Sequence, residues 1–338
     1  MHVSVAFAGL RHGHIFSLLN RVKEHPNAEV VAVCDEDAAS REEILKAGSA
    51  QISHTDISQM LAEVECDVVA IGDYFSKRGS IVIEALEAGK HVISDKPLCT
   101  RLDEWQRIES LSRERDLKVG CMFTMRDGAQ IITIRNLLQD AEIGEVHAIS
   151  FGGQHPLMLS SRAAWYFEPG THGGTINDIG CHAIDAIPWL TGLEFATINA
   201  ARSWNAFAPD FPHFQDAGQM MLTMDNGCGV LGDVSYFLPD SFGYTNPLYW
   251  RMTFWGRKGV IETSATAKHV TLMHDGETKI REIALAESNS GGCLSAFLND
   301  IQGIAQPDAL STPHVLKATR TTLMIQRAAD RGETNVAL

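Results

Sequence analysis

The sequence predicts an α/β protein: an N-terminal domain around a parallel sheet, then an α+β domain with a large, mostly antiparallel open sheet. Three observations predict this fold. The 338 residues suffice for two domains of about 150 residues each. Strand and helix patterns alternate up to residue 122, which indicates right-handed βαβ units, whereas strands follow one another after residue 149. We expect domains at 1–122 and 123–338, without a flexible linker, and a last helix that packs back on the first domain.

The first domain is expected to consist of short apolar strands separated by amphipathic helices. The expected strands are Val3–Ala8, Glu29–Cys34, Asp67–Ile71, His91–Ser94 and Leu117–Phe123. The expected helices are Ile15–Val22, Glu42–Ala47, Ser80–Ala88 and Leu102–Arg115. Gly89 ends the third helix, because glycine readily adopts the left-handed C-terminal conformation. Continuously apolar strands are typical of a parallel sheet that is buried on both faces.

The second domain has the sequence pattern of an antiparallel sheet. Its expected strands are Thr197–Trp204, Ala217–Met224, Gly229–Phe237, Leu248–Trp255, Val260–Thr263, His269–His274 and Lys279–Ala284. Turn signals such as Asp225-Asn226-Gly227 and Asp275-Gly276 separate them, as hairpins require. The expected helices are Ala129–Gln139, Cys181–Leu190, Leu294–Ile304 and Val315–Arg331.

Composition excludes several classes of protein. The chain has 42 acidic and 28 basic residues, a formal net charge of −14, so general binding to nucleic acid is not expected. No apolar run approaches the roughly 20 residues of a membrane span, and the start lacks signal-peptide features. The seven cysteines are scattered without a C-x-x-C pair, which is typical of reduced thiols. We therefore expect a cytoplasmic protein.

The turn after the first strand is a candidate phosphate-binding loop. It reads Gly9-Leu10-Arg11-His12-Gly13-His14, in which only Gly9 keeps the register of the dinucleotide fingerprint G-x-G-x-x-G. An ordinary glycine turn after a buried strand explains it equally well. Its position between the first strand and first helix favours dinucleotide binding. Arg11, His12 and His14 crowd the approach but could add donors or positive charge toward a phosphate.

The second strand ends at Asp35, about 20 residues further on, where an acid can accept hydrogen bonds from the adenine-ribose hydroxyls. Glu36 and Asp37 add to the repulsion of a ribose 2′-phosphate. The acids favour NAD over NADP as the cofactor. The alternative is a solvated strand end, where acids are common.

Two motifs carry a resemblance to a known family. Residues 84–97 end in Asp95-Lys96-Pro97, at the carboxyl end of a buried strand, where parallel sheets bind ligands. Residues 173–185 read Gly-Gly-Thr-Ile-Asn-Asp-Ile-Gly-Cys-His-Ala-Ile-Asp. With 142–146 and 255–260, these segments resemble the glucose–fructose oxidoreductase/inositol dehydrogenase (Gfo/Idh/MocA) family over essentially the whole chain.

The resemblance implies a Rossmann domain, a second domain whose open sheet mediates homodimers or homotetramers, and NAD(P)-dependent redox chemistry on sugars, polyols or related cyclic compounds. It places Lys96, Asp178 and His182 as the catalytic trio. It also implies cofactor contacts along Asp73–Arg78, where the family's Thr-Pro-x-x-x-His segment has been replaced, and around Lys96. The cofactor residues it implies with the glycine turn are Gly9, Arg11, His12, Gly13, His14, Asp35, Asp73, Arg78, Asp95, Lys96 and Pro97. The implied substrate contacts are Lys96, Arg126, His155, Trp165, Tyr166, Asp178 and His182.

The trio suits oxidation of an alcohol. Burial and a cationic nicotinamide would both lower the pKa of Lys96 and make it a base. Asp178 and His182, four residues apart, can share one helix face, where Asp178 orients the substrate and His182 exchanges a proton. Which of Lys96 and His182 is the primary base stays open.

Three alternatives remain. The scaffold could retain NAD to drive glycoside cleavage or epimerisation, or could serve as a non-catalytic sensor of dinucleotide or sugar. A metal site would have to use His172, Asp178, Cys181 and His182, which lack a recognised zinc spacing, so no metal is expected.

Overall fold

The computed structural model describes residues 2–304, 306 and 308–338. The chain divides into two compact units. The first comprises Met1–Met122, Gly170–Gly173 and Gly291–Arg320, and the second Phe123–Pro169, Gly174–Ser290 and Thr321–Leu338. Segments far apart in the sequence thus complete each unit.

The first unit is built on a five-stranded parallel sheet with the order β2-β1-β3-β4-β5. Its strands are β1 (Val3–Ala8), β2 (Ala28–Cys34), β3 (Val68–Ile71), β4 (His91–Ser94) and β5 (Val119–Cys121). Its helices are α1 (His14–Glu24), α2 (Ala38–Ala47), α3 (Ile57–Glu63), α4 (Phe75–Glu87), α5 (Leu102–Arg115), α8 (Gly292–Ile301) and the first half of α9 (Thr312–Arg331). The order reverses at β1, which has β2 on one side and β3 on the other, so a ligand is expected beyond the carboxyl ends of β1 and β3.

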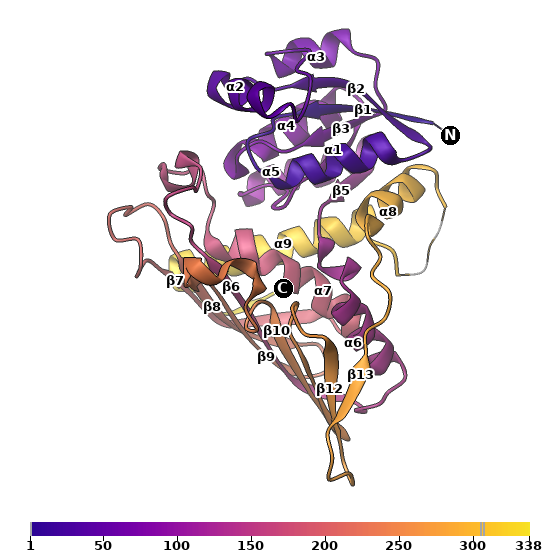
Figure 1. Cartoon of the computed structure of the whole chain (residues 1–338), viewed down its shortest axis with the longest axis vertical. Helices are drawn as coiled ribbons and strands as arrows, with labels where there is room; N and C mark the ends of the chain where they lie inside the picture. Colours follow the sequence, from indigo (N-terminus) through magenta and orange to yellow (C-terminus); the bar gives the residue numbers. More distant parts are fainter. Residues whose placement is uncertain (1, 305, 307) are drawn as a thin grey trace. The chain divides into compact units, whose positions relative to one another are not determined.

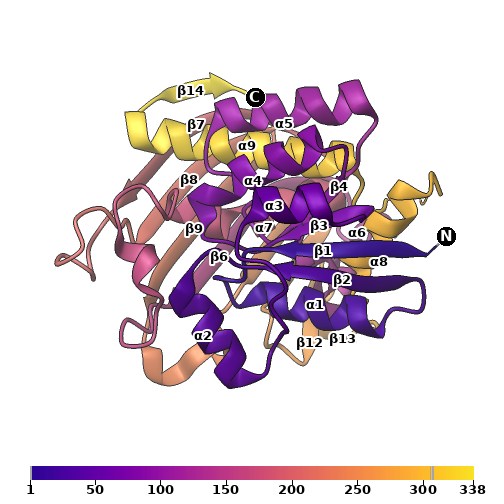
Figure 2. The same cartoon turned by 90° about the horizontal axis from the view of Figure 1, so that it is seen from above.

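Helices cover both faces of this sheet. Figure 2 shows α1 on one side of the sheet and α4 and α5 on the other. Phe7, Leu18 and Phe297 belong to one buried cluster, which places α8 with α1. A Cβ on Gly120 of β5 would lie 2.7 Å from the Phe297 ring, so glycine is required where α8 packs. The start of α9 also belongs to this unit, because the Trp105 indole donates to the Leu316 carbonyl at 2.9 Å.

The second unit contains a nine-stranded sheet with the order β13-β12-β11-β10-β6-β9-β8-β7-β14. Its strands are β6 (Val146–Pro156), β7 (Phe195–Trp204), β8 (Ala217–Met224), β9 (Gly229–Leu238), β10 (Arg251–Gly256), β11 (Gly259–Thr263), β12 (His269–His274), β13 (Arg281–Ala284) and β14 (Thr334–Ala337). All described neighbours pair antiparallel except β6 and β9. Its α-helices α6 (Ala129–Gln139) and α7 (Cys181–Thr191) lie along one face of the sheet (Figure 1). The short helical turns are η1 (Thr124–Asp127), η2 (Ala164–Phe167), η3 (Ile176–Gly180) and η4 (Asp240–Thr245).

The predicted fold class is confirmed: a parallel sheet followed by a large, mostly antiparallel one. Three elements were not anticipated: α3, β6 and β14. The seven residues of α3 give only two helical turns, β6 contains Gly152-Gly153, and β14 is a four-residue edge strand. Among the described residues, no helix combines the length and the apolar character needed to cross a membrane.

Candidate functional site

The turn after β1 packs closely on the loop after β3. Gly9 has φ +73°, and a Cβ there would lie 2.6 Å from the Cβ of Asp73. A Cβ on Gly72 would lie 2.4 Å from that of Ile15, and the His12 N–H donates to the Gly72 carbonyl at 3.0 Å. Only glycine tolerates both the left-handed backbone and the close approach at position 9. The turn therefore lies where the strand order reverses.

The helix that follows this turn begins without a side-chain cap. Gly13 precedes α1, no acid occupies its first turn, and a Cβ on Gly13 would meet no atom within 4 Å. The first N–H groups of a helix attract anions. In α1, the N–H groups of Ile15 and Phe16 donate to the carbonyls of His12 and Gly13 through longer bonds of 3.2 and 3.3 Å. Arg11 brings a cation to the same turn, 3.7 Å from Asp37 and 4.0 Å from Asp73. The residues present therefore fit the diphosphate of a dinucleotide.

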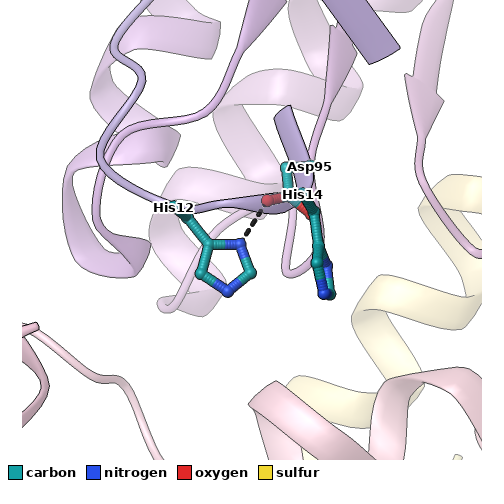
Figure 3. A group of neighbouring side chains, drawn as sticks. All are labelled: His12, His14 and Asp95. Atoms are coloured by element: carbon teal, nitrogen blue, oxygen red, sulfur yellow. Dashed lines mark hydrogen bonds and ion pairs between the residues drawn. The ribbon is translucent and has the colours of Figure 1, made fainter. Parts of the chain in front are cut away.

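His12 joins this turn to the triplet at the end of β4. Its Nδ1 atom hydrogen-bonds Oδ2 of Asp95, as Figure 3 shows. Burial lowers the pKa of His12 to about 4, so the imidazole is neutral near pH 7. The ring of His14 lies 4.5 Å away, and its side chain is half exposed.

Arg78 binds the Asp95-Lys96-Pro97 triplet through hydrogen bonds and an ion pair. Its side chain is fully buried, and it donates to the carbonyl oxygens of Asp73 (2.7 Å), Lys96 and Pro97 (3.3 Å). Its Nη2 lies 3.2 Å from Oδ2 of Asp95. Burial alone would raise the pKa of Asp95, but His12 and Arg78 hold it well below its usual range. Arg78 was expected as a cofactor contact. In the structure, its hydrogen bonds hold the backbone of Asp73 and of the triplet.

Lys96 follows in a buried, partly aromatic environment. It is 5% exposed, its peptide bond to Pro97 is cis, and Nζ lies 5.5 Å from the centre of the Phe75 ring. The same ring contacts His12 at 5.2 Å and His172 at 5.4 Å. One cluster in the first unit therefore contains the glycine-turn histidine and the amine of the triplet.

Asp35 lies just after β2 with its side chain turned into the protein. Its carboxylate is fully buried and accepts hydrogen bonds from the Leu10 N–H (2.8 Å), the Asp37 N–H (2.9 Å) and the Ser40 hydroxyl (2.9 Å). It ties the end of β2 to the glycine turn. Glu36 pairs with Lys77 at 2.6 Å. Asp37 caps α2 through the Ser40 N–H at 2.8 Å. The acids at this strand end are therefore partners within the fold.

In the second unit, Asp178 lies in η3, a π-helical turn that leads into α7. The N–H groups of Ile176 and Asn177 both donate to Oε1 of Gln326, at 3.0 and 3.2 Å. Asp178 is buried and accepts a hydrogen bond from the Tyr236 hydroxyl. Burial and Asp178 raise the pKa of Tyr236 well above its usual value, so the phenol stays a donor. Single π-helical turns occur frequently at functional sites.

His155, one of the candidate substrate residues, lies in an aromatic cluster, which we define as His155, Tyr236, Tyr244, Tyr249 and Trp250. Ring centres of the other four lie 5.1–6.2 Å from that of His155. His182 is 9% exposed and contacts the Trp250 ring at 5.8 Å. The structure thus links Asp178, through Tyr236, to the rings beside His182.

Trp165 and Tyr166 continue this cluster. Their rings stack at 4.1 Å, and the Arg162 guanidinium lies over Tyr166 (4.9 Å) and Tyr236 (5.4 Å). Sequence reasoning missed Arg162, Tyr236 and Trp250. The alternation along β9, which buries Val230, Gly232, Val234 and Tyr236, was a signal that could have found Tyr236.

Arg126 makes a buried bidentate ion pair. Its Nε and Nη2 lie 2.7 Å from the two carboxylate oxygens of Asp185. Its Nη1 atom is buried and donates no hydrogen bond within the described part of the chain. The resemblance implies a substrate contact for Arg126, and the structure shows its side chain paired with Asp185.

Two family models match the chain. One, described as "Oxidoreductase family, NAD-binding Rossmann fold", matches residues 3–123. The other, "GFO/IDH/MocA C-terminal domain", matches residues 131–262. Together they cover most of the sequence.

Individual proteins are similar to this chain at low sequence identity. Inositol 2-dehydrogenase 2 of Saccharopolyspora erythraea is 27% identical over 72% of this chain and 68% of its own length. An uncharacterised oxidoreductase, sll0816 of Synechocystis, is 25% identical over 50% of this chain, and the match spans less than half (46%) of that relative. The solved structure of an Erwinia carotovora oxidoreductase superimposes with a TM-score of 0.85 at 24% identity, covering 97% of this chain and 98% of its own. That structure shows the shared fold.

Proposed function

The chain belongs to the Gfo/Idh/MocA family of oxidoreductases, and on that premise we propose that it transfers hydride between an alcohol of a sugar, polyol or related cyclic compound and a nicotinamide dinucleotide. The observation that carries the proposal is one network in the first unit. His12 of the glycine turn bonds Asp95, and Lys96 lies over the same Phe75 ring that His12 contacts. A cofactor loop and a candidate base are thereby part of one cluster.

The dinucleotide supplies a hydride acceptor at nicotinamide C4. Gly9, Arg11 and the uncapped start of α1 would bind its diphosphate. In oxidation, the carbinol carbon loses hydride to the nicotinamide while Nζ of Lys96 or the imidazole of His182 takes the hydroxyl proton, so the alcohol becomes a ketone. Reduction runs the same steps backward.

His182 and Asp178 act on the substrate side of this proposal. His182 donates to, or exchanges a proton with, the reacting oxygen, and either it or Lys96 is the primary base. Asp178, held by Tyr236, accepts from a neighbouring hydroxyl. The aromatic cluster supplies apolar surface for the ring of a sugar or cyclitol.

NAD is the favoured cofactor. Asp35, Glu36 and Asp37 place negative charge at the end of β2, which opposes a 2′-phosphate. The cations beside them are already engaged, because Arg41 donates to the Asp35 carbonyl at 2.9 Å and Lys77 pairs with Glu36. Tighter binding of NADP than of NAD would overturn this assignment.

We also propose that copies of the chain associate through the second sheet. On β8 and β9, Met221 and Leu231 are cross-strand neighbours and are 53% and 59% exposed. Trp255 of β10 and Met273 of β12 are exposed as well. Apolar side chains gathered on one sheet face are typical of an interface.

The test is a turnover and binding assay with the purified chain. NAD and NADP are each combined with inositols, aldoses, polyols and sugar acids, and formation of the reduced cofactor is followed by absorbance. We expect reduced cofactor with at least one cyclic polyol or sugar, and thermal stabilisation by NAD. Cofactor that stays bound through purification, without net reduction by any alcohol, would instead favour the glycosidase or epimerase alternative. Binding of neither dinucleotide would contradict the proposal.

A further inference from the structure

Two imidazoles in the glycine turn face one buried carboxylate. Nδ1 of His12 bonds Oδ2 of Asp95, and Nδ1 of His14 lies 3.5 Å from Oδ1 of the same residue (Figure 3). One ligand atom from each of the three residues lies within 4.8 Å of the other two. Each oxygen of the Asp95 carboxylate thus faces the Nδ1 atom of one histidine.

One of these separations has the size found in the ligand shell of a small cation. In a tetrahedral zinc site with bonds of about 2.0–2.1 Å, ligand atoms lie roughly 3.3–3.4 Å apart. The His14–Asp95 separation already has this size. The shorter His12–Asp95 contact would have to lengthen to the same size as the ion replaces the proton between the two atoms.

One oxygen of the Asp95 carboxylate is available to a further ligand. Oδ1 of Asp95 is buried and accepts no hydrogen bond within the described part of the chain. Oδ2 is oriented by Arg78 at 3.2 Å, and carboxylates that ligate metals are usually held by such additional contacts. The side chain of His14 is 56% exposed, which gives an ion a path to the cluster from solvent.

We propose that His12, His14 and Asp95 form a binding site for a divalent transition-metal ion, with Zn²⁺ the best match. Two imidazoles and one carboxylate suit zinc, cobalt or iron, whereas magnesium prefers oxygen ligands. Three protein ligands leave at least one coordination position open to water or another ligand. Sequence analysis expected no metal and weighed only His172, Asp178, Cys181 and His182 as ligands. Asp95 is separated from His12 by 83 positions, and no spacing rule connects them.

The test is metal binding to the whole chain, measured without reference to turnover. Protein freed of metal with EDTA is titrated with Zn²⁺ by calorimetry and with Co²⁺ by visible absorption. We expect one ion per chain and no response to Mg²⁺. His14→Ala should weaken Zn²⁺ binding at least about tenfold. Loss of a residue that only supports a metal ligand already lowers metal affinity by about that factor, and loss of a ligand itself should cost no less. His2→Ala, which removes an imidazole of similar exposure (53%), should bind as the wild type does.

His12→Ala is the second variant, with circular dichroism to confirm that it folds. It should also lose the ion. Absence of micromolar Zn²⁺ binding to the wild type, or wild-type affinity in His14→Ala, would overturn the site and leave a hydrogen-bonded His12–Asp95 pair. Thiolate bands in the Co²⁺ spectrum would also overturn it, because they would assign the ion to cysteine. None of these outcomes bears on whether the chain is a dehydrogenase.

Discussion

Arg78, which is fully buried, donates a hydrogen bond to the backbone carbonyl of Lys96. The same guanidinium reaches the Asp73 carbonyl and the Asp95 carboxylate, so it joins the loops that follow β3 and β4. The backbone of the proposed base is therefore fixed by a side chain of α4. The Lys96 amine and the Arg78 guanidinium both lie over the Phe75 ring, at 5.5 and 4.8 Å from its centre.

Replacing Arg78 should strongly destabilise the protein. Arg78→Met leaves the Asp95 carboxylate buried without its cation, which should lower the free energy of unfolding by about 3–5 kcal/mol. Arg107→Met removes an exposed arginine whose pair with Glu87 is solvated, and should change it by no more than about 1 kcal/mol. Urea denaturation measures both. Similar small losses for the two variants would contradict a central role for Arg78.

Replacing Lys96 should stop turnover without removing the cofactor. Lys96→Met deletes the proposed proton acceptor, so kcat should fall about 10²–10⁴-fold, the usual contribution of acid–base catalysis. The affinity for NAD, measured by calorimetry, should change little. Lys46→Met, on the exposed face of α2, serves as the control with unchanged kcat. Full activity in Lys96→Met would remove the amine from the mechanism.

Gly9 should be far less tolerant of substitution than another left-handed glycine. Gly48→Ala, at φ +62° with no atom within 4 Å of the new Cβ, should cost only the backbone strain of about 1–2 kcal/mol. Gly9→Ala adds a clash with Asp73 to that strain and should cost more, with weaker NAD binding. Thermal unfolding with and without NAD separates the two effects. Equal costs would show that the turn relaxes away from Asp73.

Removal of one hydroxyl should disturb Asp178. Tyr236→Phe keeps the ring in the aromatic cluster but takes the hydrogen bond from a buried carboxylate, which should cost about 1–3 kcal/mol of stability. Because the variant should still fold, steady-state kinetics can follow; we expect a higher KM for the substrate. Unchanged stability and KM would mean that Asp178 does not depend on Tyr236.

A charge on the open sheet face should break the proposed association. Leu231→Glu places a carboxylate beside Met221, and light scattering should then report monomers where the wild type forms dimers or tetramers. Leu45→Glu, at a 77% exposed position on α2, should leave the mass unchanged. A wild type that is itself monomeric, or a Leu231→Glu variant with wild-type mass, would exclude this face as the interface.

The sequence determined the order of elements and the two motifs. Apolar runs such as Val68–Ile71 have the length of buried strands, and the regular alternation with helices predicts a parallel sheet. It did not reveal β6, because Gly152 and Gly153 interrupt the apolar pattern. The structure explains that interruption: a Cβ on Gly153 would lie 2.9 Å from the ring of Trp250, the residue before β10, so glycine leaves room for that ring.

The motifs likewise located Lys96, Asp178 and His182 but not what surrounds them. Periodicity reports only which face of an element is buried, since it depends on neighbours a few positions away. The partners of Asp178 and Asp95 lie 58 and 83 positions distant, in Tyr236 and His12. Packing of the elements chose those partners, turned Asp35 inward toward Leu10, and placed His14 against the carboxylate of Asp95. Local sequence pattern thus determined the order of helices and strands, and long-range contacts determined the partners of the candidate site residues.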